Sequence, residues 1–119
     1  VAIAAMLRDM LNRFHDNADW PRLYLEFVSR TRDEQIAASM AHLYDHARLL
    51  AKDMVERLME AGITDPDLDA DTVSMFWCAL IDGFMLAWVM KPETFADGQL
   101  VERTVAMLWN GLAPKRICA

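Results

Sequence analysis

The chain has 119 residues, of which 55% are hydrophobic and 25% are charged, and its net charge is −6. This size fits a single domain, and the apolar content excludes a disordered chain. The negative net charge makes the chain a poor candidate for binding nucleic acid, which requires a basic surface. We find no secretory signal, and the apolar stretches are interrupted before the roughly 18 residues of a membrane span. Two cysteines, Cys78 and Cys118, make no disulfide framework, which favours a reducing cytoplasm.

Helical periodicity dominates the start of the chain. The first apolar stripe covers residues 1–15 and is already running at Val1, with no capping residue and no initiator methionine before it. We therefore expect that an upstream segment has been cut away. After a break at residues 17–19, a second stripe covers residues 20–28. Pro21 lies in its first turn, where proline is favoured.

A long third helix is predicted over residues 34–61, where apolar residues keep a spacing of three and four. Asp33 precedes this stripe and is expected to be the N-cap of the helix. Gly62 follows the stripe and is placed to end the helix, because glycine readily adopts the left-handed conformation of a C-terminal cap.

Two further helices are predicted in the second half of the chain. Asp69 or Asp71 is expected to cap the fourth helix, which runs to about Met90 before a proline stops it. The last helix is predicted over residues 98–112, with Asp97 as its cap.

No run of alternating residues is long enough for a strand, and the sequence contains no internal repeat. We therefore predict an all-α fold, a helical bundle of about five helices. Residues 1–114 are expected to form one domain, and residues 115–119 a loose C-terminal tail.

The fourth predicted helix is apolar on every side, because Asp82 is the only charge in residues 72–90. A surface helix shows one apolar stripe, so we expect a second subunit to cover part of this one. Ala79, Gly83 and Ala87 fall on one line, where another helix can approach closely. A glycine inside a helix destabilises it by roughly 1 kcal/mol relative to alanine, so the presence of Gly83 suggests that another helix approaches closely there. The alternative is that Gly83 packs against another helix of the same chain.

The last helix also has an apolar face, so that two helices from each subunit would form a symmetric four-helix interface. The opposite side of the fourth helix, which carries its tryptophans, is expected to face the core of its own subunit. The predicted homodimer interface comprises Phe76, Ala79, Leu80, Gly83, Leu86, Ala87, Met90, Val101, Thr104, Val105, Leu108 and Leu112.

The chain resembles the C-terminal part of the TetR/AcrR family of bacterial transcriptional regulators. The resemblance covers the whole chain and is strongest over residues 67–114. This stretch contains Ala-Leu-Ile-Asp-Gly-Phe at residues 79–84 and Trp-Asn-Gly-Leu-Ala-Pro at residues 109–114. Residues 31–34, before the long helix, are also similar. The order and lengths of the helices carry the resemblance together with these segments.

The resemblance implies a cytoplasmic transcriptional regulator, a repressor, that dimerises through its last two helices and encloses a pocket for a small-molecule effector. Operator DNA would be bound by an N-terminal helix-turn-helix region, which this sequence lacks, so the fragment itself should not bind an operator. Effector binding would move the first helix, hinged at residues 17–19, and change the spacing of the two DNA-reading heads. We expect no cofactor and no membrane contact.

We expect the effector pocket between the first three helices and the inward side of the fourth. Ligand pockets are mostly apolar with a few polar groups, and methionine and aromatic walls suit an apolar or aromatic ligand. For any one of these residues the alternative is an ordinary core position. The predicted lining residues are Met6, Met10, Phe14, Phe27, Met40, Leu43, Tyr44, Ala47, Trp77, Ile81, Phe84 and Trp88.

Asp82 is the polar group of greatest interest, because a carboxylate among apolar neighbours is costly to bury without a partner. It is expected either to anchor a cationic or hydroxylated ligand or to pair with an arginine or histidine of this chain or its partner. His42 and His46 lie one helical turn apart and could share a metal, but two ligands on one helix are a weak signal. The alternative for both histidines is an exposed polar face, and we predict no metal site.

Two rival functions follow from these residues. The first is a small helical-bundle enzyme that uses Asp82, His42 and His46 as acid/base groups, although the sequence contains no catalytic motif. The second is a purely structural helical dimer without a cavity.

Overall fold

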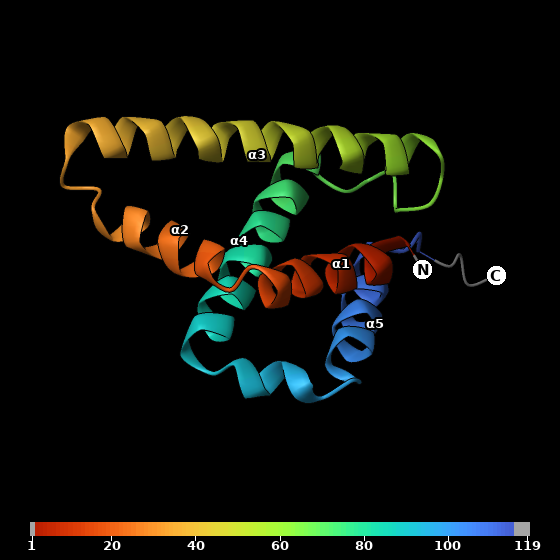
Figure 1. Cartoon of the computed structure of the whole chain (residues 1–119). Helices are drawn as coiled ribbons and strands as arrows, with labels where there is room; N and C mark the ends of the chain where they lie inside the picture. The colour runs from red at the N-terminus through yellow and green to blue at the C-terminus, as the bar shows by residue number, and fades with distance from the viewer. Residues whose placement is uncertain (1, 116–119) are drawn as a thin grey trace.

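The computed structural model describes residues 2–115, with side chains from Ala4 onward, and this part of the chain is helical without any strand (Figure 1). Val1 and residues 116–119, which include Cys118 and most of the expected tail, lie outside the described residues. The predicted all-α bundle of five helices is confirmed. In chain order the elements are α1 (Ala2–Asp16), α2 (Asp19–Ser29), α3 (Glu34–Glu60), α4 (Ala70–Met90), the short 3-10 helix η1 (Pro92–Ala96) and α5 (Leu100–Leu112).

Both predicted ends of α3 are confirmed. The Asp33 carboxylate accepts hydrogen bonds from the backbone N–H groups of Gln35, at 2.9 Å, and Ile36, at 3.3 Å. Such a cap contributes about 1 kcal/mol of helix stability. At the other end Gly62 has a φ of 72°, the left-handed conformation that favours glycine. The Gly62 N–H donates to the Met59 carbonyl and the Ile63 N–H to the Leu58 carbonyl, which together form a Schellman motif.

The beginnings of the last two helices differ in part from the predictions. Asp69 is the N-cap residue of α4, but its carboxylate accepts from the Thr72 hydroxyl, at 2.5 Å, rather than from a backbone N–H. Helix α5 begins at Leu100, two residues later than predicted. Asp97 is not its N-cap; the Asp97 carboxylate instead accepts from the Gln99 N–H in a local turn after η1. The five residues of η1 lie where the sequence indicated only a connection.

The helices form a flat molecule with extents of 55 × 34 × 18 Å. Helix α4 packs mainly against α3, which it crosses in Figure 1, and also contacts α2 and η1. Helix α1 packs against α5, and an ion pair between Arg8 and Glu102 joins these two helices. Because the molecule is thin, every long helix keeps one face in solvent.

A small apolar core runs through the middle of this assembly. Leu7 of α1 has no exposed surface, and Phe14 is also buried. Val55 of α3, Met85 of α4 and Leu108 of α5 complete the set of large buried residues that join the helices. Burying each of these side chains contributes roughly 1.5–3 kcal/mol, so the core fixes how α1, α3, α4 and α5 lie around the space between them.

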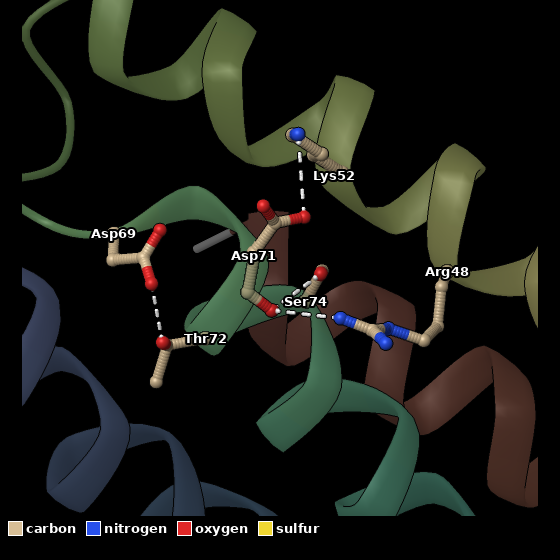
Figure 2. A network of polar contacts seen from close by, with 6 residues as sticks. All are labelled: Arg48, Lys52, Asp69, Asp71, Thr72 and Ser74. Carbon is tan, nitrogen blue, oxygen red and sulfur yellow. Dashed lines mark hydrogen bonds and ion pairs between the residues drawn. The ribbon is translucent and has the colours of Figure 1, made fainter.

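A polar network fastens the beginning of α4 to α3 (Figure 2). Lys52 of α3 pairs with the Asp71 carboxylate at 3.2 Å. The Asp71 carbonyl accepts from the Arg48 guanidinium at 3.5 Å and from the Ser74 hydroxyl at 2.8 Å. Ser74 is fully buried, so this network holds the α3–α4 crossing in a fixed geometry.

By length and composition α4 meets the criteria for a membrane-spanning helix, which corrects the expectation that every apolar stretch is too short. The error came from counting Asp82 as an interruption, whereas a span tolerates one charge. A single such helix is weak evidence, since helices of soluble proteins can pass the same test. Much of α4 is left uncovered by its own chain, and this is the feature that needs an explanation.

Candidate ligand-binding cavity

A cavity of about 380 Å³, the first cavity, lies between α1, α2, α3 and α4. Its position agrees with the expected pocket between the first three helices and the inward side of the fourth. The volume lies within the range of small-molecule sites. Its wall is formed by Met6, Trp20, Tyr24, Leu43, Tyr44, Ala47, Leu50, Ala51, Met54, Trp77, Cys78, Ile81, Asp82 and Met85.

Half of the predicted lining residues are found in this wall. They come from α1, α3 and α4: Met6, Leu43, Tyr44, Ala47, Trp77 and Ile81. The other half lie elsewhere, namely Met10, Phe14, Phe27, Met40, Phe84 and Trp88.

Three of the aromatic residues that were predicted for the wall, Phe14, Phe84 and Trp88, instead pack against one another and against Phe95. Phe95 of η1 packs on the end of α4, with its ring 5.7 Å from those of Phe84 and Trp88 between centroids. Phe14 is buried against Trp88, at 6.4 Å. These four rings therefore form a separate aromatic cluster. Phe27 is exposed on α2, and Met10 and Met40 are half-buried outside the wall.

Residues of α2 were missed by the sequence analysis. Trp20 and Tyr24 are one helical turn apart, with ring centroids 6.3 Å from each other, and both line the cavity. Their spacing was a usable signal, because aromatic residues at i and i+4 share one helix face. Leu50 and Met54 extend the same α3 stripe as the predicted Leu43 and could have been found in the same way. Ala51, Cys78 and Met85 were also missed.

Asp82 is the only carboxylate in the wall of the first cavity. None of the ion pairs in the described part of the chain involves it. Burial raises the pKa of Asp82, and the nearby Tyr24 hydroxyl partly counteracts this. The expected alternative, pairing with an arginine or histidine of the same chain, is therefore not found among residues 4–115. The negative charge of Asp82 is therefore not neutralised by an ion pair with any of these residues.

The neighbours of Asp82 keep their protons. Burial raises the pKa of Tyr24, and the negative charge of Asp82 raises it further. The same two causes raise the pKa of the Cys78 thiol. The wall of the first cavity therefore carries the hydroxyls of Tyr24 and Tyr44 and the Cys78 thiol beside Asp82, and no cationic side chain.

A second cavity of about 490 Å³ lies next to the first cavity and is larger than it. Met6, Met54 and Trp77 line both cavities and form the wall between them. The remaining lining residues of the second cavity come from the end of α3, the loop after it, α4 and α5: Val55, Leu58, Ile63, Thr64, Leu68, Val73, Val105, Trp109 and Leu112.

A comparison with protein families decides the identity of the chain. Residues 2–110 match the family described as BetI-type transcriptional repressor, C-terminal. The chain belongs to this family. It is thus a TetR-type C-terminal domain, the part of a transcription regulator that dimerises and binds regulatory ligands. No match was found among curated proteins or among solved structures.

In this BetI-type domain the expected outward side of α4 is exposed. We define the α4 outer face as Met75, Phe76, Ala79, Gly83, Leu86 and Met90, which are all exposed in the single chain. The other two α4 residues that were predicted for the interface, Leu80 and Ala87, are half-buried. A Cβ atom added to Gly83 would meet nothing within 4 Å, so the alternative that Gly83 packs against its own chain is wrong.

The predicted interface residues of α5 are placed differently. Thr104 and Leu108 are buried within the BetI-type domain itself. Val105 and Leu112 line the second cavity, and Val101 is half-buried. This face therefore packs against its own chain, because α1 crosses over it. The side of α5 that is left open carries Met107, which is 67% exposed.

The two histidines of the rival enzyme hypothesis lie apart from Asp82. His42 and His46 are exposed on α3, and neither lines the first cavity. Among the described residues, no group of three or more side chains could hold a metal ion. The BetI-type domain therefore does not bring the three proposed acid/base groups together.

Proposed function

We propose that this chain is the effector-sensing and dimerisation domain of a transcriptional repressor, and that the first cavity is its effector pocket. The observation that carries the proposal is the combination of apolar and aromatic walls with one carboxylate, Asp82, that makes no ion pair among the described residues. Family membership supports the regulatory role. Operator DNA would be bound by a helix-turn-helix region upstream of this domain.

The chemistry of the wall suggests the class of effector. A cavity of this size fits a small molecule, and its apolar surface favours an apolar or aromatic body. Asp82 would pair with one cationic or hydroxylated group. The faces of Trp20, Tyr24 and Trp77 would add to the attraction of a cation.

Helix α1 is the element that would transmit binding to the DNA-reading region. Met6 of α1 and Trp20, just beyond the α1–α2 turn, both line the first cavity. The turn itself is short: the Asn17 N–H donates to the Arg13 carbonyl, and the Trp20 N–H donates to the Asn17 carbonyl. A ligand that contacts both sides of this turn can favour one position of α1. It shifts the equilibrium only if it binds the two positions with different affinity.

The α4 outer face would form the centre of the homodimer interface. Its small residues, Ala79 and Gly83, permit close approach of the same helix from a second subunit, and the flanking Phe76, Leu86 and Met90 would be buried by it. Met107 of α5 would extend this surface. In such a dimer, the partner subunit would bury the apolar side of α4 that is exposed in the single chain.

Replacing Asp82 by asparagine tests the effector pocket. We expect benzyltrimethylammonium to raise the melting temperature of the wild-type chain more than neopentylbenzene, its neutral isostere. Asp82→Asn should weaken binding of the cation about tenfold or more, roughly 1.4 kcal/mol, and leave the neutral probe unaffected. Asp45→Asn, an exposed carboxylate of α3 outside the first cavity, is the matched control. Equal responses to the two probes, or no response of the wild type to the cation, would overturn the role of Asp82.

The same variant has a predicted pH signature in the absence of ligand. The pKa of Asp82 in the folded chain is raised above its ordinary value of 3.8, so ionising this group destabilises the folded state. Wild-type stability is lost as the pH rises from about 4 through the raised pKa. Asp82→Asn lacks this loss and should be more stable at pH 7, by less than about 1 kcal/mol because the carboxylate is partly solvated. The difference should vanish on acidification below pH 4, as followed by thermal denaturation.

A further inference from the structure

The second cavity contains one polar group whose hydrogen-bonding capacity is unused. Its wall is apolar except at Thr64, which is only 3% exposed, and at the indole N–H groups of Trp77 and Trp109. The Thr64 hydroxyl is buried and has no hydrogen-bond partner among residues 4–115. A buried hydroxyl without a partner destabilises the fold, and a bound molecule that forms a hydrogen bond with it would remove this cost.

The backbone around Thr64 is held in place. The Asp65 N–H donates to the Leu112 carbonyl at 2.9 Å, which ties the loop to the end of α5. The Asp65 carboxylate accepts from the Asp67 N–H at 2.9 Å, which closes the loop on itself. The loop thus presents Thr64 at a fixed position in the wall, and rotation about χ1 between staggered rotamers can turn its hydroxyl toward the cavity.

We propose that the second cavity is a separate binding site for a small, mainly apolar molecule with one hydrogen-bonding group, such as a phenol. The apolar body would occupy the space between α3, α4 and α5, and the polar group would pair with the Thr64 hydroxyl. A cavity of about 490 Å³ holds a small aromatic molecule, and apolar cavities in proteins accept such molecules. This site is distinct from the effector pocket and does not depend on Asp82.

The two sites share a wall, and this decides how binding must be observed. Met6, Met54 and Trp77 face both cavities, so a signal from them cannot tell the sites apart. Val55 and Val73 line only the second cavity, as does Val105. No valine lines the first cavity. Met85 lines it, and the methyl signal of Met85 therefore reports binding there.

The test uses p-cresol and toluene, which differ by one hydroxyl, on the chain labelled with ¹³C in its valine and methionine methyl groups. We expect p-cresol to shift the signals of Val55, Val73 and Val105 and to show nuclear Overhauser contacts with them. Thr64→Val should weaken this binding about three- to tenfold, the loss of one hydrogen bond, and should leave toluene binding unchanged or tighter. Thr64→Ser, which keeps the hydroxyl, should retain the preference for p-cresol.

Two controls separate this site from the fold and from the effector pocket. Thr94→Val, on exposed η1, should bind both probes as the wild type does. Because the Thr64 hydroxyl makes no internal bond, Thr64→Val should melt at or above the wild-type temperature. Shifts at Met85 alone, with the three valines unmoved at saturation, would overturn the second site and leave the effector pocket standing. Equal binding of p-cresol to wild type and Thr64→Val would overturn the pairing with Thr64.

Discussion

Replacing Gly83 by arginine is expected to turn the proposed homodimer into a monomer. Gly83 lies at the centre of the α4 outer face, and a Cβ atom at this position meets nothing within 4 Å in its own chain. The single chain therefore has room for the new side chain, and the cost falls on the interface. There, two arginines would face each other across an apolar contact. Such a like-charge burial should raise the dissociation constant about 1000-fold or more, roughly 4 kcal/mol, as measured by sedimentation equilibrium.

Two further glycine variants make this test specific. Gly98→Arg places the same charge in the exposed connection between η1 and α5, where a Cβ atom also meets nothing within 4 Å, and it should remain dimeric. Gly83→Ala should stabilise the isolated helix by about 1 kcal/mol, but it should weaken the dimer if the partner helix approaches closely. A dimer of unchanged strength in Gly83→Arg would show that α4 does not form the interface.

The second large effect is expected from filling the first cavity. Ala47 of α3 lies in its wall, so Ala47→Trp would place an indole ring in a space of about 380 Å³. Binding of benzyltrimethylammonium, measured by titration calorimetry, should then fall about 100-fold or more, roughly 2.7 kcal/mol. The ring would occupy the position of the ligand without entering the packed core, so the fold should be retained.

Ala41→Trp is the matched control for the filling variant. Ala41 is exposed on the same helix and lies outside the walls of both cavities. This variant should bind the probe like the wild type. Equal affinity in both tryptophan variants would place the effector somewhere other than the first cavity.

Local signals in the sequence were sufficient to predict the α-helices, but not the 3-10 helix η1. A side-chain cap at Asp33 and a left-handed glycine at Gly62 act within one helical turn, so their residue types alone set the ends of α3. The start of α5 was misplaced because Asp97 makes its hydrogen bond within the turn that precedes the helix. An acidic residue before an apolar stripe does not distinguish these two uses.

The lining of the pocket was only half predictable, because it depends on which face of each helix its neighbours cover. Periodicity showed that Trp77 and Trp88 share the inward side of α4. It did not show that Phe95 of η1 would cover Trp88 and leave Trp77 to the cavity. Likewise, one apolar stripe on α5 fits a partner or the chain's own core equally well. In the structure this stripe packs against the chain's own core, because Thr104 and Leu108 are buried against α1. These contacts join residues far apart in the sequence, which periodicity does not reveal.

Native mass spectrometry of the purified chain tests the central claim, that this domain dimerises and holds an effector in each subunit. It reports the assembly and any bound small molecule in one measurement. We predict a mass of two chains that carries one small-molecule adduct per subunit, and loss of both adducts in Ala47→Trp with the dimer intact. A clean monomer without adduct would contradict the account, because it would leave the α4 outer face uncovered and the first cavity without a ligand.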